Sequence, residues 1–247
     1  MRILLIISII LINMNNLQAQ ETLAYGHRGA MGHAPENTIA SIKKALELGV
    51  DGIEIDVFKC KTGEIIVFHD KKINNLTNSK GYIEQKTLSE IRALKVNGKE
   101  PIPTLDEVLK YIDGTVNLNI ELKGKNTAEG VFYIMKKAIE NVRWKADQLF
   151  VSSFVWDELR DFKKLTTEFG IAVLTDKNPL DAIPVARELN AFAINPKHSH
   201  LTQEIVNDIH SEGFEIHTWT VNKKKRIEEL ISWKVDGIIT DFPDMVF

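Results

Sequence analysis

The sequence alternates short runs of β-branched and aromatic residues with amphipathic stretches of helical length. This alternation is typical of folds in which helices cover a largely parallel sheet. A (β/α)8 barrel needs eight strands, each followed by a helix, in a chain of about 250 residues. The 247 residues have that length but offer nine candidate strands: 23–29, 52–58, 65–69, 116–123, 149–154, 171–175, 191–195, 214–221 and 237–240.

The surplus candidate is the run 65–69. Only residues 59–64 separate it from 52–58. A parallel crossover needs a dozen or more residues, whereas so short a loop joins antiparallel strands. Residues 71–103 lack a strong period and hold several Gly, Asn and Pro residues, which predicts a small insertion in the same excursion. The predicted fold class is therefore α/β, a (β/α)8 TIM barrel with a small insertion after the second strand.

Residues 1–19 have the pattern of a secretory signal peptide. Arg2 precedes the apolar run 3–12, and the small residue Ala19 lies where cleavage is expected. The run is too short to span a bilayer comfortably, and an uncleaved N-terminal anchor is the alternative. No cysteine follows the run, which argues against a lipid-modified N-terminus. We expect an exported protein, periplasmic or secreted, with a mature domain 20–247 that does not insert stably into a membrane.

Composition excludes several functions. Residues 1–19 contain one cation and no acid, so the mature chain has 30 Lys and Arg against 34 Asp and Glu, a net charge near −4. That balance argues against a general nucleic-acid binder. The basic cluster 223–226 opens a predicted helix, and we expect a solvated helix face there. Cys60 is the single cysteine, which excludes an internal disulfide and a thiolate zinc site. The sequence leaves the oligomeric state open.

Three carboxylates occupy two neighbouring barrel strands of this prediction. Side chains two residues apart on a strand share a face, so Glu54 and Asp56 project together. The same spacing places Glu121 and Lys123 on one face. Buried acids cost free energy unless a metal or a cation compensates them. Carboxylate oxygens suit Ca²⁺ or Mg²⁺, and ion pairing with Arg28 and Lys123 without a metal is the alternative.

Two histidines fall where a barrel would carry chemistry. His27 and Arg28 close the first strand, and barrel enzymes place their active sites at the carboxyl ends of strands. His69 ends the predicted hairpin, which starts at the acid-bearing strand and could fold back over the same rim. Imidazole has a suitable pKa for proton transfer near neutral pH, so the two are candidate base and acid. The other histidines show no comparable placement: His33, His198, His200, His210 and His217.

The segment between the first strand and the next helix contains Pro35, which fits the first turn of that helix. The following residues 36–38 would then face the active end of the barrel. Asn and Thr also favour helix starts, so a capping role and a direct role are equally open for this tripeptide.

Taken together, these segments resemble the glycerophosphodiester phosphodiesterase family. The matches run in order over nearly the whole mature chain and are specific as a set. They are Gly26-His27-Arg28-Gly29, Pro35-Glu36-Asn37-Thr38, Gly52-Ile53-Glu54-Ile55-Asp56-Val57, Val67-Phe68-His69-Asp70, Asn119-Ile120-Glu121-Leu122-Lys123, Val151-Ser152-Ser153-Phe154, His217-Thr218-Trp219-Thr220-Val221-Asn222 and Asp236-Gly237-Ile238-Ile239-Thr240-Asp241.

The resemblance implies a (β/α)8 barrel that hydrolyses a glycerophosphodiester to an alcohol and sn-glycerol 3-phosphate with the help of a divalent cation. It implies a metal site of Glu54, Asp56 and Glu121. It also implies that His27 and His69 serve as general base and general acid, without assigning which is which.

The same resemblance implies the substrate contacts. Arg28 and Lys123 would hold the phosphate oxygens, and Trp219 would line the glycerol or alcohol side of the pocket. Packing or loop geometry explains three further matches equally well: Ser153, Asn222 and Asp241.

Two other functions remain in view. A phospholipase-type lyase would act on lyso- or intact lipid and release a cyclic phosphate. It would need an apolar membrane-docking rim, and 71–103 show no aromatic cluster to supply one. A noncatalytic module binding anionic headgroups is the third reading, against which the complete set of acids and histidines argues. The nucleophile, either water or the neighbouring glycerol hydroxyl, and the headgroup alcohol are left open.

Overall fold

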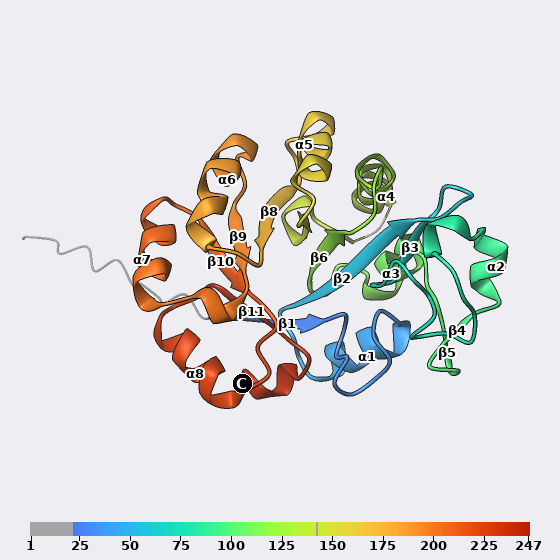
Figure 1. The fold of residues 1–247 in the computed structure, drawn as a ribbon, viewed down its shortest axis with the longest axis horizontal. Coiled ribbons are helices and arrows are strands. Elements are labelled where there is room, and N and C mark those ends of the chain that lie inside the picture. The colour runs from blue at the N-terminus through green and yellow to red at the C-terminus, as the bar shows by residue number, and fades with distance from the viewer. Residues whose placement is uncertain (1–21, 142) are drawn as a thin grey trace, which may run out of the picture.

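The computed structural model describes residues 22–141 and 143–247, so the predicted signal peptide 1–19 lies outside the described residues. Eight parallel strands close into a barrel, because the first strand pairs with both the second and the last (Figure 1). The predicted (β/α)8 fold is confirmed. In order around the barrel the strands are β1 (Leu23–His27), β2 (Gly52–Lys59), β6 (Asn117–Leu122), β7 (Leu149–Ser153), β8 (Gly170–Thr175), β9 (Ala193–Pro196), β10 (Glu215–Thr218) and β11 (Gly237–Thr240).

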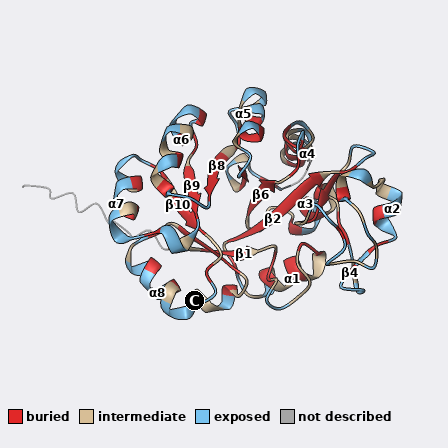
Figure 2. Cartoon of the chain, in the orientation of Figure 1, coloured by how far each residue is buried: buried red, intermediate tan, exposed pale blue. Residues whose placement is uncertain are grey.

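Helices surround the barrel, and buried positions concentrate on the strands and on the inward helix faces (Figure 2). A short 3-10 turn, Pro243–Met245, follows the last strand in place of a helix. Among the described residues, no helix is both long and apolar enough to cross a membrane. The covering helices are α1 (Ile39–Glu47), α3 (Leu105–Ile112), α4 (Ala128–Asn141), α5 (Trp156–Leu165), α6 (Ile183–Leu189), α7 (Gln203–Ser211) and α8 (Lys224–Ser232).

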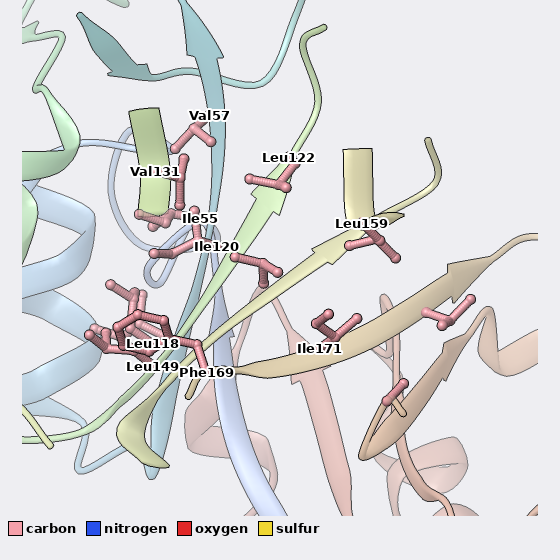
Figure 3. Close-up of a cluster of buried hydrophobic side chains, with 14 of the residues drawn as sticks. Ile55, Val57, Leu118, Ile120, Leu122, Val131, Leu149, Leu159, Phe169 and Ile171 are labelled. Carbon is pink, nitrogen blue, oxygen red and sulfur yellow. The ribbon is translucent and has the colours of Figure 1, made fainter. Parts of the chain in front are cut away.

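The main core lies between the strands and these helices. Ile55 and Ile120 are register partners on β2 and β6, and both are fully buried. They belong to one apolar cluster with Val131 of α4 and Leu159 of α5 (Figure 3). Burying such a side chain contributes about 1.5–3 kcal/mol. Because successive strand residues alternate sides, this outward apolar face leaves the intervening polar residues inside the barrel.

The predicted hairpin is present. β3 (Ile65–Val67) pairs antiparallel with β2, and Val57 lies opposite Val67. The insertion 71–103 contains a short helix, α2 (Leu88–Arg92), and a two-stranded hairpin of β4 (Lys95–Val96) and β5 (Glu100–Pro101). It has an apolar cluster separate from the barrel core: Phe58, Cys60, Ile66, Phe68, Ile73, Ile83, Ile91, Leu94, Val96 and Ile102.

The start of α1 differs from the prediction. The helix begins at Ile39, and the hydroxyl of Thr38 caps it by accepting a hydrogen bond from the Ser41 amide at 3.2 Å. Pro35 therefore lies ahead of the helix and not in its first turn, which corrects that expectation. Capping by a threonine hydroxyl fixes the helix boundary here, and residues 36 and 37 remain in a turn that faces the barrel interior.

The basic cluster lies at the start of α8. Lys223, Lys224 and Lys225 are exposed, as a solvated helix face requires. Arg226 is half-buried and stacks on Trp233, with its guanidinium carbon 4.6 Å from the ring centre.

Candidate active site

A pocket that is partly open to solvent lies at the carboxyl ends of the barrel strands. Barrel enzymes carry their small-molecule sites at this end. Asp56 lies beside the pocket and contacts its lining residues. The other predicted site residues all line it: His27, Arg28, Glu54, His69, Glu121, Lys123 and Trp219.

The three predicted metal ligands converge. Asp56 and Glu121 are register partners on β2 and β6, and Glu54 is one pleat earlier on β2. One carboxylate oxygen from each lies within 4.8 Å of those from the other two, and all three side chains are buried. Oxygen donors at this separation fit a hard divalent cation such as Ca²⁺ or Mg²⁺. The barrel thus supplies a donor set of the predicted kind.

Burial sets the charge of these acids. It raises the pKa of Glu54 well above its ordinary value, and the neighbouring Asp56 and Glu121 add to the effect. Burial and Asp56 raise the pKa of Glu121 to about 8. Burial acts in the same direction on Asp56, but Lys123 and Arg28 outweigh it and hold the pKa of Asp56 below its ordinary value. Without a further cation, burial therefore favours the neutral forms of Glu54 and Glu121, whereas Asp56 stays ionised near neutral pH.

Two cations contact the same acids. Arg28 Nε lies 3.3 Å from Asp56, but its terminal nitrogen donates to Glu36 at 2.7 Å. Lys123 Nζ lies 3.1 Å from Glu121 and 3.6 Å from Asp56. The ion pairs of the metal-free alternative are thus present. These two cations do not neutralise the three acids. Arg28 also pairs with Glu36, and the pKa of Glu121 stays raised although Lys123 lies beside it.

His27 is oriented by the far end of the chain. Its Nδ1 lies 2.6 Å from Asp241 Oδ1, and its Nε2 lies 3.9 Å from Glu54. Asn222 donates to the other oxygen of Asp241 at 2.6 Å. Although burial opposes it, the bond to His27 lowers the pKa of Asp241 below its ordinary value. A carboxylate at Nδ1 favours the tautomer with its proton on that nitrogen, which leaves Nε2 free on the pocket side.

His69 has a similar partner. Its Nδ1 lies 2.8 Å from Asp70 Oδ1. Burial lowers the pKa of His69 despite the attraction of Asp56, so the neutral ring is favoured. Both predicted histidines therefore meet at one pocket, each with a carboxylate on Nδ1.

Residues 36 and 37 have direct roles, which the sequence left undecided. Asn37 donates from Nδ2 to Asp56 at 2.8 Å, and its Oδ1 accepts from the Asp56 amide at 3.2 Å. Its backbone is left-handed, with φ of 54°, a conformation that Asn tolerates better than most residues. Asn37 thus orients one predicted metal ligand, Asp56, through two hydrogen bonds. Glu36 binds Arg28, and Thr38 caps the helix.

The remaining matches divide into two kinds. Ser153 donates to the Leu122 carbonyl at 2.6 Å and is absent from the pocket wall, so it has a packing role. Asn222 and Asp241 act on His27. Their signal in the sequence was position alone: Asp241 directly follows the last barrel strand, where polar residues face the site. None of the five unassigned histidines belongs to the pocket lining that the described residues form.

Trp219 forms an aromatic wall. Its indole nitrogen donates to the Asn195 carbonyl at 2.8 Å. Phe154 packs edge-on against it with 5.3 Å between ring centres. The hydrogen bond fixes the indole plane, so the pocket has one rigid apolar side opposite its charged side.

A closed (β/α)8 barrel with acids, imidazoles and two cations at the carboxyl ends of its strands defines an enzyme of the TIM-barrel type. The chain matches the glycerophosphoryl diester phosphodiesterase family over residues 27–245 and belongs to that family. The resemblance, the fold and the enzyme class expected from the sequence are thereby confirmed.

Relatives with this name span nearly the whole chain. The glycerophosphodiester phosphodiesterase of Caldanaerobacter subterraneus is 36% identical over 91% of this chain and 96% of its own length. The same enzyme of Bacillus altitudinis is 34% identical over 90% and 96%. The phosphodiesterase of Oleispira antarctica, solved in complex with the product sn-glycerol-3-phosphate, superposes with a TM-score of 0.84 at 27% identity and covers 92% of this chain and 95% of its own.

Proposed function

We propose that this protein hydrolyses glycerophosphodiesters to an alcohol and sn-glycerol 3-phosphate with a divalent cation, Ca²⁺ or Mg²⁺. The observation that carries the proposal is the convergence of Glu54, Asp56 and Glu121 beside His27 and His69 in one pocket. Membership of the family and the product bound to the Oleispira antarctica relative support the substrate class. The partner is a small molecule and not a nucleic acid.

The three carboxylates would hold the cation. Once bound there, a divalent cation offsets the negative charge that develops on the phosphate in the transition state. Arg28 and Lys123 flank the acids and would contact the phosphate oxygens from the same side. Arginine presents a planar fork that suits two oxygens at once.

His27 and His69 would move the protons. Asp241 and Asp70 each hold an Nδ1 proton, so the two Nε2 atoms are the groups available to the substrate. A neutral Nε2 accepts a proton from the nucleophile, and a protonated one donates to the leaving alkoxide. The lowered pKa of His69 favours its starting in the neutral form.

The nucleophile is either water or the glycerol hydroxyl next to the phosphate ester, which would pass through a cyclic phosphate. The same chemistry without the second step would make the protein a lyase. Analysis of the products by phosphorus NMR separates the lyase from the hydrolase, because a cyclic phosphate accumulates only when its hydrolysis is absent or slow.

The test of the proposal combines variants with cation removal. We expect His27→Ala and His69→Ala each to lower kcat by about 10²–10⁴-fold without changing the melting temperature much. His33→Ala is the matched control, since His33 also pairs with a carboxylate, Asp244, but lies outside the pocket. A chelator should remove activity, and Ca²⁺ or Mg²⁺ should restore it. Full activity in both pocket variants, or in excess chelator, would refute the assignment.

We further propose that the protein is exported, to the periplasm or beyond the cell, after cleavage behind residue 19. The support is the pattern of residues 1–19 alone. N-terminal sequencing of the protein from the extracytoplasmic fraction tests it. An N-terminus at Met1 on a membrane-bound protein would favour the uncleaved anchor.

A further inference from the structure

The pocket has a polar floor that the roles above do not use. Asn119 of β6 and Ser152 of β7 line it, with 1% and 0% of their surfaces exposed. Asn119 Oδ1 and Ser152 Oγ have no hydrogen-bond partner among the residues that the structure describes. Buried polar atoms are nearly always hydrogen-bonded, since leaving one unpaired costs folding free energy. Two such atoms in one pocket point to a ligand group that pairs with both.

The floor adjoins the acid cluster. Asn119 is the register partner of Glu54, and Ser152 is the register partner of Glu121. The lining also includes two apolar side chains, Leu174 and Ile239. A substrate held at the acids would therefore find its nearby hydrogen-bonding groups at Asn119 and Ser152.

The two atoms match a hydroxyl group. Asn119 Oδ1 can only accept, so it would take the proton of a ligand hydroxyl. The Ser152 hydroxyl can donate, so it would bond to the oxygen of the same group. An apolar acyl chain or a quaternary ammonium would satisfy neither atom.

The lining of the pocket differs in openness from place to place. The floor is closed, whereas Phe154, just past the end of β7, is 39% exposed and packs on Trp219. A closed subsite suits the part of a substrate that never changes, and an open one suits the part that varies. In a glycerophosphodiester the constant part is glycerol and the variable part is the alcohol.

We propose that Asn119 and Ser152 bind the terminal hydroxyl of the glycerol arm and make the enzyme selective for it. The inference rests on the proposed function and deepens it by assigning the glycerol arm to the floor. The leaving alcohol then exits along Phe154 and Trp219.

Two substrates test this assignment. One is a glycerophosphodiester, and the other is the same diester without the terminal glycerol hydroxyl. Both keep the hydroxyl next to the phosphate ester, so either nucleophile can operate. A site built to bond a hydroxyl rejects the analogue that lacks it, and we expect kcat/KM of the wild type to favour the glycerol diester by at least about tenfold.

Variants at the floor should erase this preference. In Ser152→Ala and in the near-isosteric Asn119→Leu, kcat/KM should fall for the glycerol diester and change little for the analogue. Ser152→Ala removes an unpaired hydroxyl, so its melting temperature should not fall below that of the wild type. Ser153→Ala is the matched control. It makes the same change on the other face of β7, where the hydroxyl bonds to Leu122, and should keep the wild-type preference.

The outcomes separate the two proposals. Equal turnover of both diesters by the wild type, or an unchanged preference in both floor variants, overturns the hydroxyl site and leaves the proposed function intact. Absence of turnover for both diesters overturns both proposals.

Discussion

His27 and Asp241 lie 2.6 Å apart, Nδ1 to Oδ1, although 214 residues separate them in the chain. The contact exists because β1 and β11 are neighbours at the closure of the barrel, with Gly26 opposite Thr240. The carboxylate at Nδ1 orients the imidazole and favours one tautomer. Closing the barrel thus also positions the proposed base or acid of the site.

The first prediction concerns this pair. Asp241→Asn keeps the size of the side chain but removes its charge, so Nδ1 of His27 loses its carboxylate partner and the tautomer of the ring is no longer fixed. We expect kcat to fall by about 10²-fold or more with a small change in KM. Steady-state kinetics of the variant measures it.

Asp244→Asn is the matched control for that variant. Asp244 also bonds a histidine, His33, at 2.8 Å on the same C-terminal segment, but away from the pocket. Its kinetics should equal those of the wild type. Equal loss in both variants would mean that the segment acts through stability and not through His27.

The second prediction concerns Asn37, which brackets Asp56 with two hydrogen bonds. Groups that orient a metal ligand typically contribute 10- to 100-fold in affinity, so Asn37→Ala should weaken Ca²⁺ or Mg²⁺ binding by about that factor. Calorimetric titration measures it. Asn190→Ala is the control, because Asn190 is also left-handed, with φ of 49°, but is exposed at the end of α6. Unchanged affinity in Asn37→Ala would contradict the bracketing role.

The third prediction is a pH dependence of stability in excess chelator. The pKa of Glu121 is about 8 in the folded protein against 4.5 ordinarily, so between these values the folded state binds more protons than the unfolded chain. The free energy of unfolding must then fall as pH rises, by up to about 1.4 kcal/mol per pH unit for one proton. The raised pKa of Glu54 acts in the same direction.

Two histidines act in the opposite direction. Burial lowers the pKa of His69 and of His198 below the ordinary value of 6.5, so their effect falls mainly below that pH. Denaturant unfolding between pH 6.5 and 8 therefore isolates the acids. The slope should shrink in Glu121→Gln and in saturating cation, since both remove the protonation change. A free energy of unfolding that rises with pH in this window would refute the protonated acids.

The fourth prediction compares two glycines with left-handed backbones. At Gly29, with φ of 80°, a Cβ would lie 2.5 Å from the carbonyl carbon of Ser41. At Gly49, with φ of 76°, a Cβ would meet no atom of the described residues within 4 Å. Gly49→Ala should cost about 1–2 kcal/mol of backbone strain, and Gly29→Ala about 1–3 kcal/mol more because of the clash. Denaturant unfolding of both variants measures the difference.

The same pair should differ in activity. Gly29 follows His27 and Arg28, so a shift of its backbone moves both side chains. Gly29→Ala should therefore lose turnover under conditions in which it remains folded, while Gly49→Ala keeps it. Equal stability of the two variants would contradict the predicted clash, because it would show that the backbone near Ser41 can shift to accommodate the Cβ at little cost.

Local patterns sufficed for the strands. Each barrel strand contains its own apolar and β-branched residues, and the length of the 59–64 loop alone made the 65–69 run antiparallel. The spacing of Glu54 and Asp56 likewise predicted a shared face, because the two-residue period of a strand is local geometry. These features could be predicted from the sequence.

The contacts across the barrel could not. Asp241 meets His27 only after closure, and nothing near Asp241 in the chain indicates a histidine partner. Asn37 reaches Asp56 because Thr38, and not Pro35, sets the helix start. The insertion escaped a detailed prediction because its elements are too short for periodicity, with five residues in α2.

The hairpin after β2 packs against two separate apolar cores, and both of them hold residues of the site in place. Val67 packs in the barrel core, whereas Phe68, next to His69, packs in the separate cluster of the insertion. The acids Glu54 and Asp56 stand on a barrel strand. Loosening of the insertion alone would therefore release His69 while the acid cluster kept its shape. Under the proposed roles, such a molecule would still bind the cation and the phosphate but would lack one of the two proposed proton carriers, so binding and turnover could be lost independently.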